Sequence, residues 1–523
     1  MVGVVDLPEK VLKKLNKSIL PEWKTCFYAA IIVGLLAHLY KITNWLPNWD
    51  SLVFRYDSQN MINIGRWFLP IVCSFTSFYD LPFLNGIVAI LFHALGAVCI
   101  CRTLNVHKKI TAGLIGAVIV SFPTVVSVMM YNYVADGYSI AFFLSSLAAF
   151  YMTKEKPRYI LSALFISLSI GIYQAYVTVT IMLILLKLID ETVFGNASFT
   201  AVLKRASMML LSGVGGALIY AVALKVSLAV FSTELLDYQG INSTASLSNI
   251  DLLASLYVVK ETFVDFFFDL SDGLSVHFVL NALVMTFTVV YYVKHIVCTR
   301  FYRRLVNLIL VIAMAVMLTV GAGALAFVNP SVDYHNLMLM GYAVFYIFFI
   351  LIYERGLEAK EKHTAIKCWS ILVISVLLIS NQILISNVSY HKAQIAYEKS
   401  YGTLIRIADR IEQTDGAESC DRILVVGALD DSEAYSVNLP PDITGITDGY
   451  IIRADDEIVG QSVFCSTIND YCGKNYRFVS GEEKKNLLKE ERVQAMDKWP
   501  SASCVAVIDD TVIIKLGTEG DVN

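Results

Sequence analysis

Apolar segments of roughly 20 residues recur along this chain up to about residue 388. A helix needs about 20 apolar residues to cross a hydrocarbon core of about 30 Å. Hydrophobic residues make up 56% of the 523 residues and charged residues only 16%, which is too apolar for a soluble chain of this length. The sequence therefore predicts an α-helical polytopic membrane protein. Its expected spans are 25–43, 82–101, 110–130, 138–153, 159–172, 175–189, 206–230, 276–293, 305–328, 337–353 and 366–388.

The stretch 159–189 has two interpretations, one long helix or two short ones that turn at residues 171–174. Charge decides between them. With the break in place, the N-terminal tail and alternate connections hold 22 Lys and Arg residues, whereas the opposite connections hold only Arg55, Arg66 and Lys260. Basic residues concentrate on the cytoplasmic side of a membrane protein. We therefore predict about 11 spans, with the N-terminus in the cytoplasm and the C-terminus outside.

Three parts follow from this topology: a cytoplasmic tail at 1–24, a transmembrane domain at 25–388 and an extracytoplasmic α/β domain at 389–523. In the last part, helical spacing over 390–413 precedes β-branched runs at 422–426 and 504–515. Its cysteines fit either disulfides or free thiols, and the lack of CxxC spacing disfavours a metal site. The net charge of −4 gives no support to nucleic-acid binding. These cysteines are Cys420, Cys465, Cys472 and Cys504.

The first outer loop, 44–67, carries Asp50, Arg55, Asp57 and Arg66 among aromatic residues. A transferase at a membrane surface needs a carboxylate to accept a proton from an acceptor hydroxyl, and cations to hold a departing phosphate. Asp50 and Arg66 suit these roles. The two aspartates would share a face of a helix and could instead hold a divalent ion such as Mg²⁺ or Mn²⁺. Alternatively, all four are solvated residues near lipid headgroups, with the tryptophans as an interfacial belt.

Further polar groups are predicted on the same side of the membrane. Each by itself fits a turn, a helix cap or a bonded histidine. Together they could line one cleft, because polar groups are too costly to bury in lipid. The run 257–268, within an acidic outer segment, is typical of an amphipathic helix at the membrane surface and is interpreted as scaffold. The candidate substrate-binding residues are Asp136, Tyr173, Gln174, Asp333 and His335.

Three stretches resemble a known family, the bacterial type II Gtr glucosyltransferases, which glucosylate O-antigen and related surface glycans. They are Asn63-Ile-Gly-Arg-Trp67, Asn132-Tyr-Val-Ala-Asp-Gly-Tyr-Ser-Ile-Ala141 and Ser167-Leu-Ser-Ile-Gly-Ile-Tyr-Gln-Ala-Tyr176. The resemblance covers roughly residues 25–350 and leaves the C-terminal domain outside.

The resemblance implies a GT-C-like enzyme of the bacterial cytoplasmic membrane. Such an enzyme takes a sugar, typically glucose, from a polyprenyl-phosphate donor at the outer leaflet and joins it to a surface glycan. It implies inversion by direct displacement, with Asp50 or Asp57 as base. Arg66 and Arg55 are the candidate residues for binding the donor phosphate. The family's compact acidic pair is not evident, so base and metal ligand stay open between the two aspartates. A flippase and a polyprenyl-phosphate glucose synthase are implied partners.

Three other interpretations predict different features. A transporter or flippase would carry ionisable residues in the middle of its spans, where His93 and Lys225 are the clearest examples here. A glycan polymerase of similar topology would differ in the sizes of its donor and acceptor. A membrane-anchored receptor would work through residues 389–523.

Overall fold

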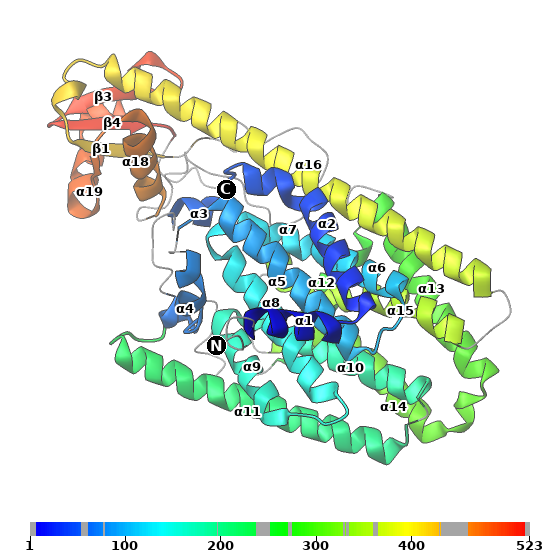
Figure 1. Ribbon diagram of the computed structural model, residues 1–523. Coiled ribbons are helices and arrows are strands. Elements are labelled where there is room, and N and C mark those ends of the chain that lie inside the picture. Colours follow the sequence, from blue (N-terminus) through cyan, green and yellow to red (C-terminus); the bar gives the residue numbers. More distant parts are fainter. Residues whose placement is uncertain are drawn as a thin grey trace. The chain divides into compact units, whose positions relative to one another are not determined.

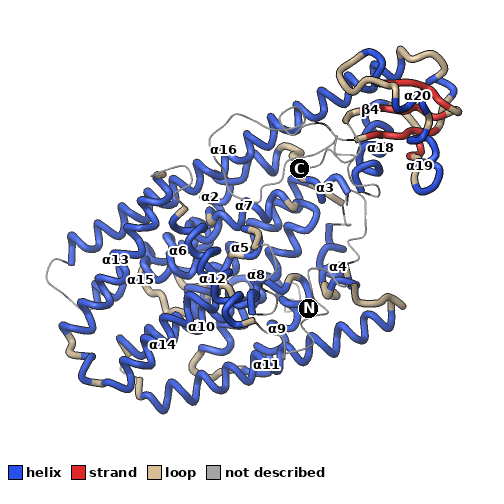
Figure 2. The backbone as a smooth tube through the Cα atoms, turned by 180° about the vertical axis from the view of Figure 1, so that it is seen from behind, coloured by secondary structure: helices blue, strands red, loops and turns tan. Residues whose placement is uncertain are grey.

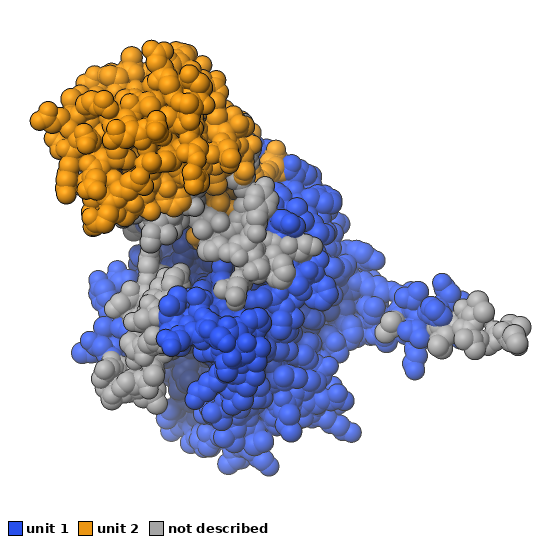
Figure 3. Space-filling model, turned by 90° about the vertical axis from the view of Figure 1, so that its left-hand side faces the viewer, with its two compact units in different colours: residues 1–43, 57–387, 443–445 blue, residues 44–56, 388–442, 446–523 orange. Residues whose placement is uncertain are grey.

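The computed structural model describes residues 7–53, 61–76, 79–195, 197–236, 251–269, 275–327, 330, 334–358, 364–427, 429 and 459–517 (Figure 1). These residues form two compact units, which Figure 3 colours separately. Unit 1 contains the described residues up to Thr43 and those from Met61 to Asn387. Unit 2 contains Asn44–Val53 and the described residues from Val388 onward. Helices occur throughout, whereas the strands belong to the C-terminal part of the described chain (Figure 2).

Unit 1 is helical in the part of the chain that the structure describes. Its last helix, α16, begins in unit 1 and ends in unit 2. The helices are α1 Leu7–Ser18, α2 Pro21–Thr43, α4 Leu69–Cys73, α5 Pro82–Thr103, α6 Lys109–Ser121, α7 Pro123–Met130, α8 Asn132–Thr153, α9 Tyr159–Ile172, α10 Val177–Val193, α11 Phe199–Val230, α12 Leu252–Phe268, α13 Val276–Cys298, α14 Leu305–Ala322, α15 Ala343–Glu358 and α16 Thr364–Glu412. Short 3-10 turns include η1 Ile62–Ile64, η2 Ser74–Thr76, η3 Gln174–Tyr176 and η8 Asn336–Met338.

Among the described residues, 8 helices are long and apolar enough to cross a bilayer, or 9 if α6 and α7 form one bent span. The chain is thus a polytopic helical membrane protein, and each predicted span contains helical residues. Helices α9 and α10 have only 14 and 17 residues. The count of 11 spans and the orientation of the termini stay predictions.

The predicted break between two short helices is confirmed. Helix α9 ends at Ile172, the backbone of Tyr173 is extended with φ −154° and ψ 119°, and η3 begins at Gln174. A second break separates α6 from α7 with a bend of 42°. There Phe122 precedes Pro123 and has φ −60° and ψ 139°, because the proline ring disfavours helical backbone at the residue before it.

One predicted boundary was wrong in a way that matters for function. The sequence placed the start of a span at residue 138, but α8 begins at Asn132. Asp136 is therefore a helical residue and not part of a loop. The polar run at 132–136 lies in the helix because its side chains are bonded inside the protein: Asn132 donates to Asp80, and Asp136 accepts from Thr76.

Helices α2, α5, α6 and α8 pack closely at small residues. A Cβ atom at Gly116 of α6 would fall on the backbone carbonyl of Cys26 in α2, and one at Gly86 of α5 would fall on the Ile42 side chain. Glycine at these two points lets the helix axes approach, as is common between helices in membranes. The packed core places the end of α2 beside the start of α5.

A buried ionic network joins α10, α11 and α15. Asp190 on α10 accepts hydrogen bonds from Nε and Nη2 of Arg355 on α15, both at 2.8 Å. Glu191 pairs with Lys187 at 3.5 Å and with Arg205 of α11. Basic residues from two connections that the sequence assigns to the cytoplasm thus neutralise carboxylates near the end of α10.

Replacement of Arg355 by alanine should destabilise unit 1. Asp190 is 4% exposed, and its carboxylate would then be buried without its cation, which typically costs about 3–5 kcal/mol. We expect a lower midpoint of thermal unfolding in detergent and a lower yield in membranes. Arg303→Ala, at an exposed position, is the matched control and should unfold like the wild type. Equal midpoints for Arg355→Ala and the control would contradict the role of this pair.

Unit 2 is built on a four-stranded sheet in the order β2-β1-β4-β3. Strand β1 is parallel to β2 and β4, whereas β3 and β4 form an antiparallel hairpin. Asp509 and Asp510 connect the hairpin with positive φ values of 48° and 55°, the backbone that two-residue hairpin turns favour. The elements are β1 Arg422–Val426, β2 Arg477–Phe478, β3 Val505–Ile508, β4 Thr511–Lys515, α3 Trp49–Val53, α18 Val459–Cys472, α19 Gly481–Lys489 and α20 Glu491–Gln494.

The sheet separates two hydrophobic clusters. Side chains alternate along a strand, so Ile423 and Val425 of β1 face one side and Leu424 and Val426 the other. The first side is covered by the end of α16 and by α18, and the second by α19 and α20. In the described residues of the C-terminal part, the sheet thus lies between two layers of helices, whereas a separate extracytoplasmic domain stays a prediction.

All four cysteines of unit 2 are free thiols. Cys465 and Cys504 are buried in the first cluster, and Cys420 and Cys472 pack against it. Burial raises the pKa of the Cys465 and Cys504 thiols above the usual value, so little reactive thiolate forms near neutral pH. Of the two interpretations that the sequence left open, the structure has the unpaired one.

Candidate active site

The guanidinium of Arg66 lies at the centre of the three sequence stretches singled out above. Its Nη1 donates a hydrogen bond of 2.7 Å to the Tyr138 hydroxyl. The Cζ atom of Arg66 lies 4.8 Å from the ring centroid of Tyr173 and 5.8 Å from the ring centroid of Tyr138. The two rings are stacked at 4.5 Å with an angle of 14°. A cation over aromatic faces is held by attraction to the ring quadrupoles, which fixes the plane of the guanidinium.

Backbone contacts hold the same stretches together. The Phe68 N–H donates to the Gly171 carbonyl at 2.8 Å, and a Cβ atom at Gly171 would overlap the Trp67 indole. Nε2 of Gln174 donates to the Ile64 carbonyl at 3.4 Å. Residues on both sides of the break at Tyr173, namely Gly171 and Gln174, thus hold the backbone on both sides of Arg66.

Gly65 permits the turn that presents Arg66. Its φ of 86° lies in the left-handed region, which only glycine adopts readily. The Tyr220 hydroxyl, from α11, donates to the Gly65 carbonyl at 3.0 Å. Sequence reasoning missed Tyr220, because a tyrosine within an apolar span gives no signal that distinguishes it from a packing residue.

Asp136 is 1% exposed and its carboxylate is fully engaged. It accepts hydrogen bonds from Thr76 Oγ1 at 2.9 Å and from the Gly137 N–H at 2.9 Å, with Cys73 Sγ at 3.8 Å. These contacts tie α8 to α4 and η2.

A second polar cluster lies where α2 ends and α5 and α8 begin. Asp80 accepts a hydrogen bond from the Asn132 side chain, and Nδ2 of Asn85 donates to the Asn132 carbonyl at 3.0 Å. Lys41, 1% exposed in the last turn of α2, is close enough for Asp80 to act on it electrostatically. The sequence gave no reason to select Lys41, because a lysine near the end of an apolar span ordinarily extends its ammonium into the headgroups.

His335 caps a short turn. Its Nδ1 accepts a hydrogen bond of 3.2 Å from the Leu337 N–H at the start of η8, and its ring packs edge-on against Tyr131 at 5.7 Å. Nδ1 is therefore the unprotonated nitrogen of a neutral imidazole here. This agrees with the interpretation of His335 as a bonded histidine.

The other predicted site residues belong to different parts of the structure, and some lie outside the described residues. Asp50 is a half-exposed residue of α3 in unit 2, whereas Arg66, Asp136, Tyr173 and Gln174 belong to unit 1. Arg55, Asp57 and Asp333 lie outside the described residues. Among the residues that the structure describes, no group of three His, Cys, Asp or Glu side chains could hold a metal ion. An ion between Asp50 and Asp57 stays a prediction, because one of its two ligands is not described.

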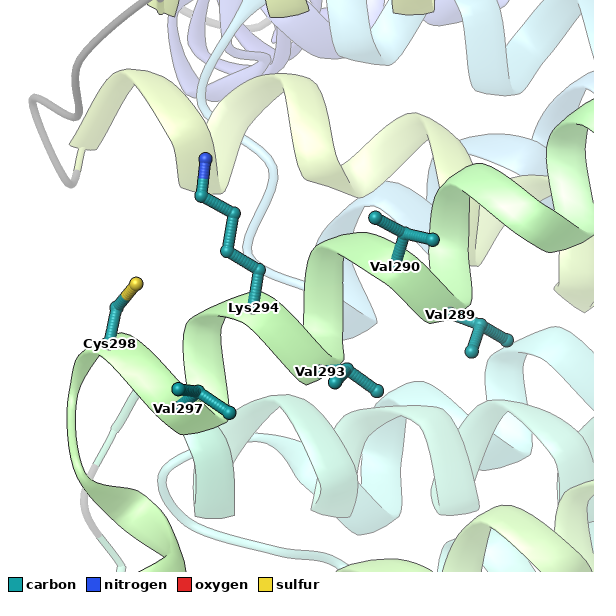
Figure 4. A pocket seen from close by; sticks show the side chains of 6 residues that line it. All are labelled: Val289, Val290, Val293, Lys294, Val297 and Cys298. Atoms are coloured by element: carbon teal, nitrogen blue, oxygen red, sulfur yellow. The ribbon is translucent and has the colours of Figure 1, made fainter.

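Two further features do not contribute to this site. A groove along α13 is lined by Val289, Val290, Val293, Lys294, Val297 and Cys298, whose side chains project from the helix in Figure 4. It is almost wholly apolar, as expected for a helix surface that faces lipid.

The two ionisable residues that the sequence places within spans differ in burial. His93 is buried, with Nδ1 bonded to the Ala89 carbonyl at 2.9 Å and its ring stacked on Phe142 at 5.0 Å, while Lys225 is exposed.

The fold and this centre define a polytopic helical membrane protein in which three separate stretches assemble around one arginine. The family model for glucosyl transferase GtrII matches residues 39–348, which is more than half of the chain. The chain therefore belongs to the GtrII glucosyltransferase family, as the three stretches predicted, and is a membrane glucosyltransferase. No curated protein and no solved structure matches it.

Proposed function

We propose that this protein transfers glucose from a polyprenyl-phosphate donor to a surface glycan at the outer face of the bacterial cytoplasmic membrane. The observation that carries the proposal is the assembly of the three family stretches around Arg66. In this topology the N-terminus is cytoplasmic and the C-terminal domain is extracytoplasmic. A polyprenyl-phosphate glucose synthase would make the donor and a flippase would bring it to the outer leaflet.

Arg66 is proposed to bind the donor phosphate, with Arg55 as a second cation. A planar guanidinium is suited to phosphate oxygens because it offers several N–H donors in a fixed geometry. Its position over Tyr173 and Tyr138 keeps it oriented before the donor arrives. Preorganised charge of this kind stabilises a leaving group without reorganisation during the reaction.

The proposed reaction is a direct displacement with inversion. Asp50 or Asp57 accepts the proton of an acceptor hydroxyl, whose oxygen forms a bond to the anomeric carbon of glucose. The bond from that carbon to the phosphate oxygen breaks, and polyprenyl phosphate leaves with the electron pair. A Mg²⁺ or Mn²⁺ ion on the two aspartates would serve the same departure by neutralising phosphate charge.

The other predicted residues are proposed to contact or support the substrates. Tyr173 and Gln174 adjoin Arg66, so they are suited to the sugar or the phosphate. Asp136 would act by fixing the turn that contains Thr76, because its oxygens already accept the hydrogen bonds described above. Asp333 and His335 complete the proposed substrate-binding set.

Purified full-length protein in detergent micelles tests this proposal directly. Micelles have no two compartments, so a transporter or flippase would show no activity, whereas a transferase should move glucose from polyprenyl phosphate to the glycan. In cells, mass measurement should show surface glycans that lack one hexose per modified unit when the gene is deleted. Unchanged glycan masses together with no transfer in micelles would refute the proposal.

A further inference from the structure

The segment Asn44–Val53, which precedes Arg55 and Asp57 in the predicted outer loop, is buried in unit 2. Leu46 is 2% exposed and Leu52 is 3% exposed, and the side chains of Asn48 and Ser51 are wholly buried. This burial is unusual for a connection between two spans, because loops ordinarily run over the surface. Other residues of unit 2 must therefore cover the segment Asn44–Val53.

The partners are residues more than three hundred positions away in the chain. Leu52 belongs to the hydrophobic cluster formed by Leu404 and Ile407 of α16, Phe464 of α18 and strand β1. Helix α3 packs against α18. The Trp45 ring meets the Tyr397 ring edge-on at 5.6 Å between centroids. The C-terminal part and this short segment thus share one core.

The local backbone of α3 is also held. The Asn48 side-chain oxygen accepts a hydrogen bond of 2.8 Å from the Ser51 N–H, and the Leu52 N–H donates to the Asn48 carbonyl at 3.2 Å. A helix of 5 residues has no stability of its own, so the cap and the Leu52 contact must supply it. Asp50, two residues before Leu52, lies on a different side of the helix and is half-exposed.

We infer that the C-terminal part of unit 2 is a positioning element for Asp50, with Leu52 and Trp45 as the residues through which it acts. The inference rests on the proposed role of Asp50 as the base. The C-terminal part lies beyond the family match at 39–348, yet the segment it holds lies within that match. The unit therefore sets the geometry of proton removal from the acceptor and leaves donor binding unchanged.

Leu52→Ala in the full-length protein tests this inference. A misplaced base should lower kcat roughly 10- to 100-fold, since a shift of about 1 Å has effects of that size. The Michaelis constant for the donor should stay within about twofold of wild type. Leu52→Met conserves volume, and near wild-type kcat is expected from it. Tyr397→Ala, which disturbs the same segment from the other partner, should lower kcat in the same way.

Leu424→Ala is the matched control. Leu424 is wholly buried, but it belongs to the cluster on the other face of the sheet, so the same atoms are removed without a contact to α3. If it lowers kcat as much as Leu52→Ala at equal folded amounts, general destabilisation explains the effect and the inference is wrong. Unchanged kcat in both Leu52→Ala and Tyr397→Ala would also overturn it.

A double variant separates this inference from the proposed function. If Leu52 acts through Asp50, then Leu52→Ala should cause no further loss in an Asp50→Asn background. If Asp50→Asn alone keeps full transfer, Asp50 is not the base and the positioning inference fails, whereas the proposed function then rests on Asp57. If Asp50→Asn is inactive and Leu52→Ala is fully active, the proposed base stands and the positioning inference fails.

Discussion

Replacement of Asp50 by asparagine should reduce transfer about 100- to 10,000-fold, the usual contribution of a positioned general base. Asparagine has nearly the same shape but cannot accept the hydroxyl proton, so packing of α3 should be unaffected. The measurement is initial rate of transfer from polyprenyl-phosphate glucose to the glycan, at equal amounts of protein in the membrane. Binding of the donor should change little.

Asp57→Asn must be measured beside it, because the sequence leaves the base open between the two aspartates. One of the variants should lose transfer; if both do, and added Mg²⁺ or Mn²⁺ shifts the residual activity of either, the shared-ion interpretation gains support. Asp265→Asn is the control: Asp265 is an exposed carboxylate of α12, in the segment interpreted as scaffold, and its variant should be fully active. Full transfer by both Asp50→Asn and Asp57→Asn would eliminate the proposed base.

Arg66→Ala should raise the Michaelis constant for the donor about tenfold or more. Hydrogen bonds to charged groups contribute about 1.5–3 kcal/mol, and every 1.4 kcal/mol corresponds to a factor of about ten. The constant for the acceptor should stay near the wild-type value, because the proposed partner of Arg66 is the donor phosphate. Equal donor constants for Arg66→Ala and wild type would contradict that role.

Two milder variants locate the origin of the Arg66 effect. Arg66→Lys keeps the charge but loses the planar donor group and its stacking on Tyr173, so an intermediate donor constant is expected. Tyr138→Phe removes only the hydroxyl that accepts the 2.7 Å hydrogen bond and keeps the stacked ring. A smaller increase is expected from it. If Arg66→Ala lowers the unfolding midpoint as much as Arg355→Ala, a structural role for Arg66 would explain the kinetics.

Polar residues near the two ends of α10 are held by different kinds of contact. Arg66 is held by aromatic rings, whereas Asp190 and Arg355 neutralise each other by two hydrogen bonds.

Part of the candidate site was predictable because its signals are local. The break at Tyr173 follows from charge on the flanking connections, and the polar residues of the outer loops point to Arg66, Tyr173 and Gln174. Their convergence with Tyr138 was not predictable from spacing, because residues separated by 72 positions meet only through helix packing. Asp80, Lys41 and Tyr220 were missed for the same reason: each takes its environment from distant elements.

The sequence by itself determined that this chain is a polytopic helical membrane protein, that 159–189 breaks into two helices, and that 422–426 and 504–515 form strands. It missed the break at Phe122 and strand β2. These predicted properties depend on the length and apolarity of each segment and on the turn residues beside it, all within a short stretch of sequence. The thickness of the bilayer sets how long an apolar helix must be to cross it. Only the tertiary structure decided that the first loop is divided, with Asp50 in one unit and Arg66 in the other. The sequence does not reveal which residues Leu52 and Trp45 contact. The hydrophobic effect is non-directional, so an apolar side chain can be buried against any apolar surface that the folded chain brings near it.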